Sequence, residues 1–231
     1  MGAFKERLKR IPIFGMISWL RNAYARESLD YTKMFRSCGR DVRIDGNVTI
    51  SNCHMITVGH NVIIHKGVII NGAGGLHIGS NTGISFDTII WTVEHNYVNA
   101  ERLPFDENLI LKPVRINDNV MIGAGVRISP GIEIGEGAVI GMASFITKDI
   151  PPLAIAMGSP ARVIGHRDKE HYERCKAEGR FVRHSVYDKM IVPLYIQKRP
   201  SLFEVIREEV DKGEIILEAD SADGNVPGPA T

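Results

Sequence analysis

The chain has 231 residues, a formal net charge of +1 and a hydrophobic content of 44%. A charge this close to neutral excludes a protein that binds nucleic acid through its overall charge, so no nucleic-acid partner is expected. The three cysteines are odd in number and widely separated, which argues against both a disulfide framework and a structural zinc site.

Residues 1–41 differ in composition from the rest, because the first forty residues carry nine Lys or Arg against three acidic residues. Two structures fit this basic and apolar mixture. One is an amphipathic segment with residues 1–20 in peripheral contact with an anionic membrane. The other, which we favour, is a pair of short helices that cap a repeat domain. The apolar run at 11–20 is too short to cross a bilayer, and no signal-peptide cleavage site follows it. We therefore expect a cytoplasmic protein, at the inner membrane surface if the first alternative holds.

The clearest pattern is an isoleucine at every sixth residue from Ile116 to Ile146. A helix cannot keep residues six apart on one face, and a simple strand would not be interrupted by Gly, Pro and Asp. A period of six with a turn signal in each unit predicts short strands that are joined by corners and stacked as a solenoid. The isoleucines should point inward and form a dry core. The same repeat begins at residue 42, and its phase shifts by two residues near Val58 and near Gly72–Gly75, where corners are expected.

The repeat is interrupted over residues 91–115. Excursions of this length are uncommon in compact domains and are usually functional. After it, the repeat continues to the Pro151-Pro152 pair, which cannot extend a strand ladder. We expect the solenoid domain at 42–167, a helical extension at 168–213 and a disordered acidic tail at 214–231.

These features together resemble a known family. The hexads, the interrupting segment with its histidine, and the ending ITKDIPP…AMGSPARVI are similar to the hexapeptide-repeat acyltransferases, and most of all to sugar O-acetyltransferases of the galactoside, maltose and polysaccharide-modifying type. The resemblance covers residues 42–167. It implies an all-β solenoid, a left-handed parallel β-helix with helical N- and C-terminal additions. It also implies a homotrimer with active sites between subunits, acetyl-CoA as co-substrate and no metal.

The resemblance places the catalytic general base at His95, inside the excursion. A neutral imidazole can take the proton from an acceptor hydroxyl as the hydroxyl attacks a thioester. The alternative is a surface histidine without a role. Since Glu94 should point away from His95 on an extended segment, a backbone carbonyl or a residue of another coil is expected to orient the ring. Acceptor-binding candidates are Asp87, His65, Asn71 and Glu94. For Asp87 an Asx turn at a corner is an equal alternative, and for His65 and Asn71 an exposed position without a role is the alternative.

The expected acetyl-CoA site lies in the late coils. Its candidate residues are Gly123, Ala124, Met142, Thr147, Lys148 and Arg162. Lys148 and Arg162 would pair with the phosphates, and backbone N–H groups of Gly123 to Gly125 could stabilise an oxyanion. The alternative for both cations is a solvated surface charge. Family members often carry an aromatic residue where this chain has Met121 and a small one where it has Met142. Because methionine is adaptable, transfer of a longer acyl group is an alternative to acetyl transfer.

The sequence therefore favours an acetyl-CoA-dependent O-acetyltransferase acting on a sugar in surface-polysaccharide assembly. One alternative is N-acetylation of an amino sugar nucleotide, although residues 1–41 are too few for a separate nucleotide-binding domain. Another is a non-catalytic or metal-binding β-helix scaffold, for which His60, His65, His77 and His95 are the candidate ligands. The N-terminal acceptor-binding segment of galactoside and maltose enzymes has no match here, which favours a lipid-linked or polymeric sugar over a simple free glycoside.

Overall fold

The computed structural model describes residues 29–182, 194–196 and 215–217. Most of the N-terminal segment predicted at 1–41, including the membrane contact proposed for 1–20, lies outside the described residues. The chain divides into two units, residues 1–187 and 188–231, and each is described by itself. Among the residues that the structure describes, no helix is long and apolar enough to cross a membrane.

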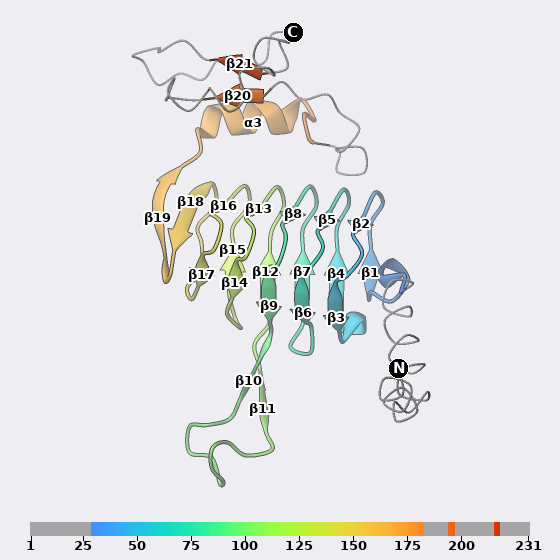
Figure 1. Cartoon of the computed structure of the whole chain (residues 1–231), viewed down its shortest axis with the longest axis vertical. Helices are drawn as coiled ribbons and strands as arrows, with labels where there is room; N and C mark the ends of the chain where they lie inside the picture. Colours follow the sequence, from blue (N-terminus) through green and yellow to red (C-terminus); the bar gives the residue numbers. More distant parts are fainter. Residues whose placement is uncertain (1–28, 183–193, 197–214, 218–231) are drawn as a thin grey trace, which may run out of the picture. The chain divides into compact units, whose positions relative to one another are not determined.

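The first unit is a solenoid, in which each turn of the chain adds one short strand to each of three parallel sheets (Figure 1). Sheet A contains β1 (Ser37–Cys38), β4 (Ile56–Val58), β7 (Leu76–Ile78), β12 (Val114–Ile116) and β15 (Glu133–Ile134). Sheet B contains β2 (Arg43–Ile44), β5 (Ile63–Ile64), β8 (Gly83–Ile84), β13 (Met121–Ile122), β16 (Val139–Ile140), β18 (Ala154–Gly158) and β19 (Ala161–His166). Sheet C contains β3 (Thr49–Ser51), β6 (Ile69–Asn71), β9 (Ile89–Trp91), β14 (Arg127–Ile128) and β17 (Phe145–Ile146). The predicted solenoid is confirmed, and β1 starts it before the expected residue 42.

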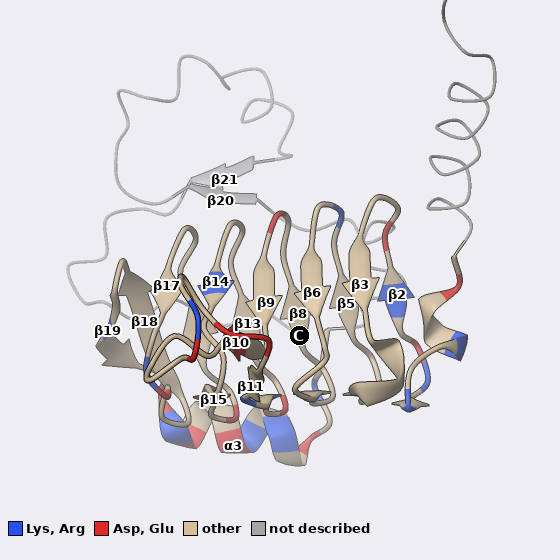
Figure 2. Ribbon diagram, turned by 90° about the horizontal axis from the view of Figure 1, so that it is seen from below, with Lys and Arg blue, Asp and Glu red and all other residues tan. Residues whose placement is uncertain are grey.

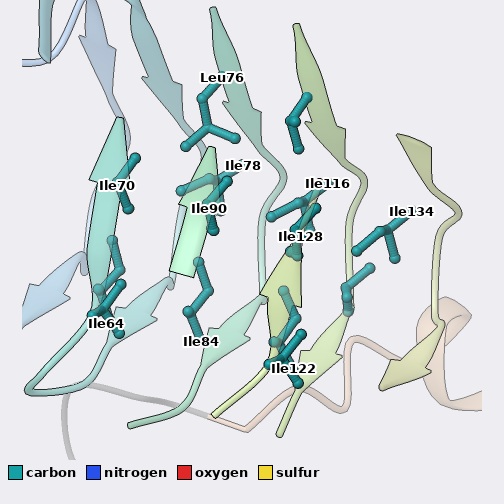
Figure 3. Packing of buried hydrophobic residues seen from close by; sticks show 14 of the residues in the cluster. Ile64, Ile70, Leu76, Ile78, Ile84, Ile90, Ile116, Ile122, Ile128 and Ile134 are labelled. Carbon is teal, nitrogen blue, oxygen red and sulfur yellow. The ribbon is translucent and has the colours of Figure 1, made fainter. Parts of the chain in front are cut away.

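The isoleucines of successive coils stack in register inside the prism, as predicted (Figure 3). In sheet B, Ile64 pairs with Ile84, Ile84 with Ile122, and Ile122 with Ile140. All four side chains are at most 1% exposed. Burying one isoleucine contributes roughly 1.5–3 kcal/mol. The core is therefore purely aliphatic here, and any chemistry must lie on the outer surface.

The two phase shifts of the repeat lie at corners, as predicted. The first corresponds to the 3₁₀ turn η2 (Cys53–Met55), and the second to the turn that precedes β7. The corners after the strands of sheets A, B and C are named the A–B, B–C and C–A edges. The chain often has a positive φ there, with Asn81 and Asn119 at 56° and 60° on the A–B edge. Asparagine tolerates this backbone better than most residues.

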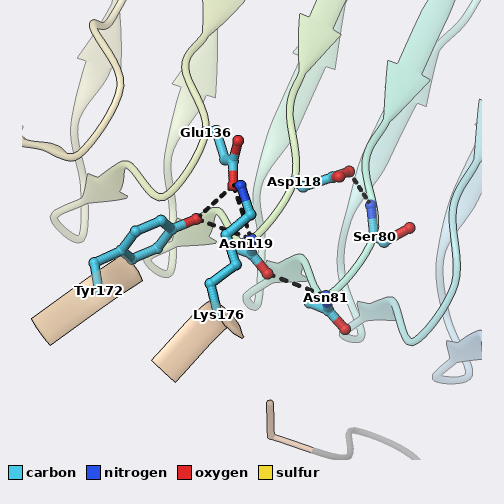
Figure 4. Close-up of polar contacts among 7 residues, drawn as sticks. All are labelled: Ser80, Asn81, Asp118, Asn119, Glu136, Tyr172 and Lys176. Atoms are coloured by element: carbon cyan, nitrogen blue, oxygen red, sulfur yellow. Dashed lines mark hydrogen bonds and ion pairs between the residues drawn. The ribbon is translucent and has the colours of Figure 1, made fainter. Parts of the chain in front are cut away.

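The A–B edge carries a ladder of amide side chains that ends at α3 (Lys169–Ala177). Asn81 Nδ2 donates to Asn119 Oδ1 at 3.0 Å, and Asn119 Nδ2 donates to the Tyr172 hydroxyl at 2.8 Å (Figure 4). Glu136 Oε1 accepts from the Tyr172 hydroxyl at 2.8 Å and pairs with Lys176 Nζ at 2.6 Å. The coil strands carry few charges, whereas α3 carries both signs (Figure 2). Polar contacts to the ladder therefore hold α3 on the solenoid.

This contact makes the docking of α3 dependent on pH. Burial opposes ionisation of Glu136, but hydrogen bonds from Lys176 and Tyr172 hold its pKa below the ordinary 4.5. The stabilisation by the ionised Glu136 is therefore complete above pH 4.5, the ordinary pKa, and is lost as the pH falls through the lower pKa of the folded state. We expect amide hydrogen exchange in α3 to accelerate in that acid range. In Glu136→Gln, exchange should be faster at neutral pH and lose this pH dependence, whereas Glu173→Gln, at an exposed position of α3, should behave as wild type. Equal pH profiles in the two variants would contradict this assignment.

Beyond residue 167 the structure differs from the sequence-based prediction. The helical extension expected at 168–213 contains α3, but also the strand β20 (Leu194–Ile196). β20 pairs in parallel with β21 (Ile215–Leu217), inside the range predicted to be disordered. Both strands consist of aliphatic, β-branched and aromatic residues, which favour extended backbone. For β21 alone, the acidic composition of the tail obscured this local signal.

Candidate active site

The excursion between β9 and β12 is a β-hairpin that projects from the coils at the C–A edge (Figure 1). Strand β10 (Val93–His95) pairs antiparallel with β11 (Leu109–Leu111), and His95 lies opposite Leu109. The excursion was predicted, but its strands were not, because three-residue strands give too little alternation to read from sequence. Placing the histidine on paired strands rather than on an open loop restricts its motion.

The His95 side chain is exposed and stacks on the ring of Phe105. The ring centroids are 4.0 Å apart and the planes are inclined by 23°. Within residues 29–182 no hydrogen bond to the imidazole is present, so the predicted carbonyl or side-chain partner from another coil is not found. Its two nitrogens are therefore accessible to substrates.

Glu94, an acceptor-binding candidate, forms an ion pair instead. Lys112 Nζ lies 2.6 Å from Glu94 Oε2, and both side chains are partly exposed. Because Lys112 follows β11 and Glu94 lies on β10, the pair ties the two strands together at the base of the hairpin. Glu94 thus has a structural partner in Lys112, and nothing in its contacts indicates a direct role beside His95.

Asn71 also has local partners on the C–A edge. Its Oδ1 accepts from the backbone N–H of Ala73 at 3.1 Å and from Asn52 Nδ2 at 3.4 Å. The first contact caps the turn that precedes β7, which is a common task of asparagine in turns. Thr147 and Lys148, both exposed, lie on this same edge after β17.

The remaining acceptor candidates lie on the B–C edge. His65 Nδ1 is 2.8 Å from Asp45 Oδ2, and its ring stacks on Phe86 with the centroids 4.5 Å apart. Burial raises the pKa of Asp45, but the hydrogen bonds from His65 and Arg43 outweigh it and hold that pKa below the ordinary value. A hollow of about 320 Å³ beside His65 is lined also by Ser85 and Met121. His65 is thus an oriented imidazole beside an open pocket.

Asp87 follows on the same edge with a φ of 56° and an exposed side chain. Its carboxylate lies directly over Gly67, where an added Cβ would meet Asp87 Oδ1. Aspartate is among the few residues that adopt this backbone readily. Asp87 thus lies at a corner of the coil, and both alternatives, an Asx turn and a contact with an acceptor, stay predictions.

The acetyl-CoA candidates divide between the two edges. Ala124 and Met142 lie on successive coils of the B–C edge, with Met142 75% exposed. Arg162 lies on β19, which pairs antiparallel with β18 at the end of sheet B, and its side chain is exposed. Lys148 lies on the C–A edge. A single chain therefore presents two separate groups of candidate residues: His95, Asn71, Glu94, Thr147 and Lys148 on one edge, and His65, Asp87, Gly123, Ala124 and Met142 on another.

The predicted oxyanion donors need a correction. The N–H of Gly123 donates to Ile140 O at 2.9 Å and that of Gly125 donates to Phe86 O at 2.8 Å. Stacked coils use these groups for inter-coil hydrogen bonds, so neither can also serve an oxyanion. Among the described residues, the N–H of Ala124 has no such partner and remains the candidate donor of this corner.

Sequence reasoning missed Asp45, Phe105 and Asp106. Asp45 lies one coil before His65 on the B–C edge, so the coil repeat itself could have indicated their contact. Phe105 and Asp106 lie in the non-repeating segment, where no period gives their position. The four histidines considered as metal ligands are dispersed, with His60 accepting from Arg40 N and His77 contacting Thr57. In the part of the chain that the structure describes, no three His, Cys, Asp or Glu side chains gather as a metal site.

Known proteins are similar to this chain in sequence and in fold. Residues 113–148 match the family described as bacterial transferase hexapeptide (six repeats). Galactoside O-acetyltransferase of Escherichia coli (strain K12) is 36% identical over 138 residues, which are 58% of this chain and 57% of that protein. The chain is thus similar to hexapeptide-repeat acetyltransferases in its repeats and in part of its sequence.

Solved structures of acetyltransferases are similar to the chain as well. A maltose O-acetyltransferase from Clostridium difficile 630 is similar with a TM-score of 0.58 and 29% identity, over 66% of this chain and 86% of that one. A galactoside acetyltransferase in complex with coenzyme A is similar with a TM-score of 0.52 and 26% identity, over 67% and 79%. Because the chain spans 57% of the length of the E. coli galactoside relative, the activity of this hexapeptide-repeat protein must be inferred from its own residues.

Proposed function

We propose that this chain is an acetyl-CoA-dependent O-acetyltransferase that acts on a sugar, with His95 as the general base. The observation that carries the proposal is the hairpin that interrupts the coil stack and holds an exposed imidazole. Every coil isoleucine of the sheet B column from Ile64 to Ile140 is sealed in the core, so the coils supply a rigid frame and the hairpin supplies the acid–base group. The coenzyme A complex of a galactoside acetyltransferase supports the choice of donor.

The reaction would proceed in two steps. His95 takes the proton of the acceptor hydroxyl as its oxygen attacks the thioester carbonyl, which gives a tetrahedral intermediate and an imidazolium. The Ala124 N–H would stabilise the developing oxyanion. The intermediate then expels the CoA thiolate, which takes the proton back from His95. The products are an acetyl ester and free CoA, and the imidazole is neutral again.

We further propose that the active site forms between two copies of the chain, as part of a homotrimer. The support is the division of candidate residues between the C–A and B–C edges, which one prism cannot bring together. The hairpin also exposes apolar residues, with Leu109 at 52% and Leu111 at 58%. A neighbouring copy placed against this hairpin would cover them, and closed symmetry would repeat the contact.

Lys148 should bind acetyl-CoA through the phosphates. We expect Lys148→Ala to raise the Kd for CoA about tenfold, the loss of one charge-assisted contact of about 1.5 kcal/mol. Isothermal titration calorimetry with CoA measures this directly. Lys169→Ala removes an equally exposed lysine on α3 and should leave the Kd unchanged. If both variants bind CoA as the wild type does, Lys148 is not part of the acetyl-CoA site.

The acceptor class is tested by incubating the full chain with acetyl-CoA and a panel of hydroxyl sugars, amino sugars and lipid-linked or polymeric sugars. Mass spectrometry before and after mild alkali separates labile esters from stable amides. We expect an ester. An alkali-stable product on an amino sugar would establish N-acetylation instead, and the absence of any product with all acceptors would refute the proposed activity. We expect the activity to be cytoplasmic, and to favour lipid-linked or polymeric sugars.

A further inference from the structure

The loop at the end of the hairpin is closed by Asp106, a carboxylate that is only 5% exposed. Its Oδ2 accepts from Asn96 Nδ2 at 2.7 Å, and its Oδ1 accepts from the backbone N–H of Asn108 at 2.9 Å. One side chain thus connects the residue after His95 to the residue before β11. The Asn108 N–H holds the pKa of Asp106 below its ordinary value, against the opposing effect of burial, so the carboxylate is ionised at neutral pH.

Backbone hydrogen bonds extend this closure beyond the paired strands. Asn96 N donates to Asn108 O at 3.1 Å, and Asp106 N donates to Asn96 O at 3.2 Å. The chain from Asp106 to Asn108 is therefore held against Asn96 by both main-chain and side-chain contacts. His95 immediately precedes this point, so its backbone has little freedom to move.

Phe105 immediately precedes Asp106 and is positioned by the same contacts. Its ring stacks on the His95 imidazole at a centroid distance of 4.0 Å. Stacking contacts one face of the imidazole, whereas both nitrogens point out from the ring edge. The contact can therefore fix the plane of the ring without occupying a nitrogen that the reaction needs.

We propose that Phe105, anchored by Asp106, is the residue that positions His95 for proton transfer. This inference rests on the proposed function, since it assigns a partner to the same general base. Glu94 cannot take this role in the described structure, because it is paired with Lys112 at 2.6 Å. Stacking replaces the carboxylate or carbonyl that fixes many catalytic histidines. Phe105 and Asp106 are positioning residues and do not themselves contact the reacting atoms.

The positioning effect should appear in kcat. Misplacement of a catalytic group by about 1 Å can cost about a hundredfold in rate. We expect Phe105→Leu, which keeps apolar bulk but removes the aromatic face, to lower kcat about tenfold to a hundredfold. The KM for acetyl-CoA should remain within about twofold, since binding the thioester does not require the stack. Asp106→Asn should also lower kcat. Phe105→Tyr, which retains the aromatic ring, should keep kcat near the wild-type value.

A spectroscopic readout separates positioning from general loss of structure. In the full chain with labelled histidine, the Phe105 ring current should displace the carbon-bound ring protons of His95 in the NMR spectrum. Their resonances should move toward the values of an exposed histidine in Phe105→Leu and stay in place in Phe105→Tyr. Tyr97→Leu is the matched control, because Tyr97 is an exposed aromatic residue of the same loop and should change neither kcat nor the His95 resonances.

Unchanged His95 resonances and an unchanged kcat in Phe105→Leu would overturn the inference. So would a Tyr97→Leu variant that loses as much activity as Phe105→Leu. Failure of the proposed function has a different signature. In that case the wild-type chain itself transfers no acetyl group, while the resonance shift between wild type and Phe105→Leu is still observed.

Discussion

His95→Ala is expected to lower kcat for acetyl transfer by about a hundredfold to ten-thousandfold, the usual contribution of a general base. The reason is that no other imidazole lies on this hairpin to take the proton of the acceptor hydroxyl. The KM for acetyl-CoA should change little, because the candidate phosphate contacts lie on later coils. Steady-state release of CoA with a saturating acceptor measures both constants.

His54→Ala provides the control for this experiment. His54 is an exposed histidine in η2, on the same C–A edge but nearer the N-terminal end of the solenoid. Its replacement should leave kcat within about twofold, since it lies far from the hairpin along the stack. A His95→Ala enzyme with full activity would exclude His95 from the mechanism, whatever the effect of His54→Ala.

Ile122→Ala is expected to reduce the free energy of unfolding by about 2–5 kcal/mol. Ile122 is 1% exposed and lies between Ile84 and Ile140 in the sheet B column, so its removal leaves a cavity that rigid neighbouring coils cannot fill. Urea denaturation at one fixed protein concentration measures the change, which avoids confusion with any effect of association.

Ile110→Ala is the matched control for stability. Ile110 lies on β11 and is 37% exposed. Its loss should change the free energy of unfolding by no more than about 0.5 kcal/mol in the isolated chain. A core variant as stable as this surface variant would be incompatible with a continuous isoleucine column.

The solenoid could be predicted from sequence because one physical rule repeats. Each coil needs a buried aliphatic residue at every sixth position, and Ile116 to Ile146 satisfy this without a gap. The phase shifts were also readable, since extra residues fit at corners such as η2 without disturbing the strands. The excursion could be located for the same reason, as the segment where the rule no longer holds.

The contacts of the candidate site could not be predicted in the same way. Inside the excursion, the stack of Phe105 on His95 and the closure by Asp106 depend on a loop conformation that no period specifies. On the coils, Gly123 and Gly125 were expected to offer N–H groups, but the inter-coil ladder already uses them. The sequence thus predicts candidate residues, whereas the hydrogen bonds of the structure decide which of their atoms remain available.

The division of residues between two edges is the central claim, and mixed oligomers test it most directly. Two inactive chains with different tags, His95→Ala on the hairpin and Ala124→Trp on the B–C edge, would be co-expressed and purified through both tags. If each site combines the hairpin of one copy with the B–C edge of another, mixed trimers should recover about a third of wild-type transfer. Mixed oligomers as inactive as either parent, or chains that cannot be isolated together, would contradict a shared site.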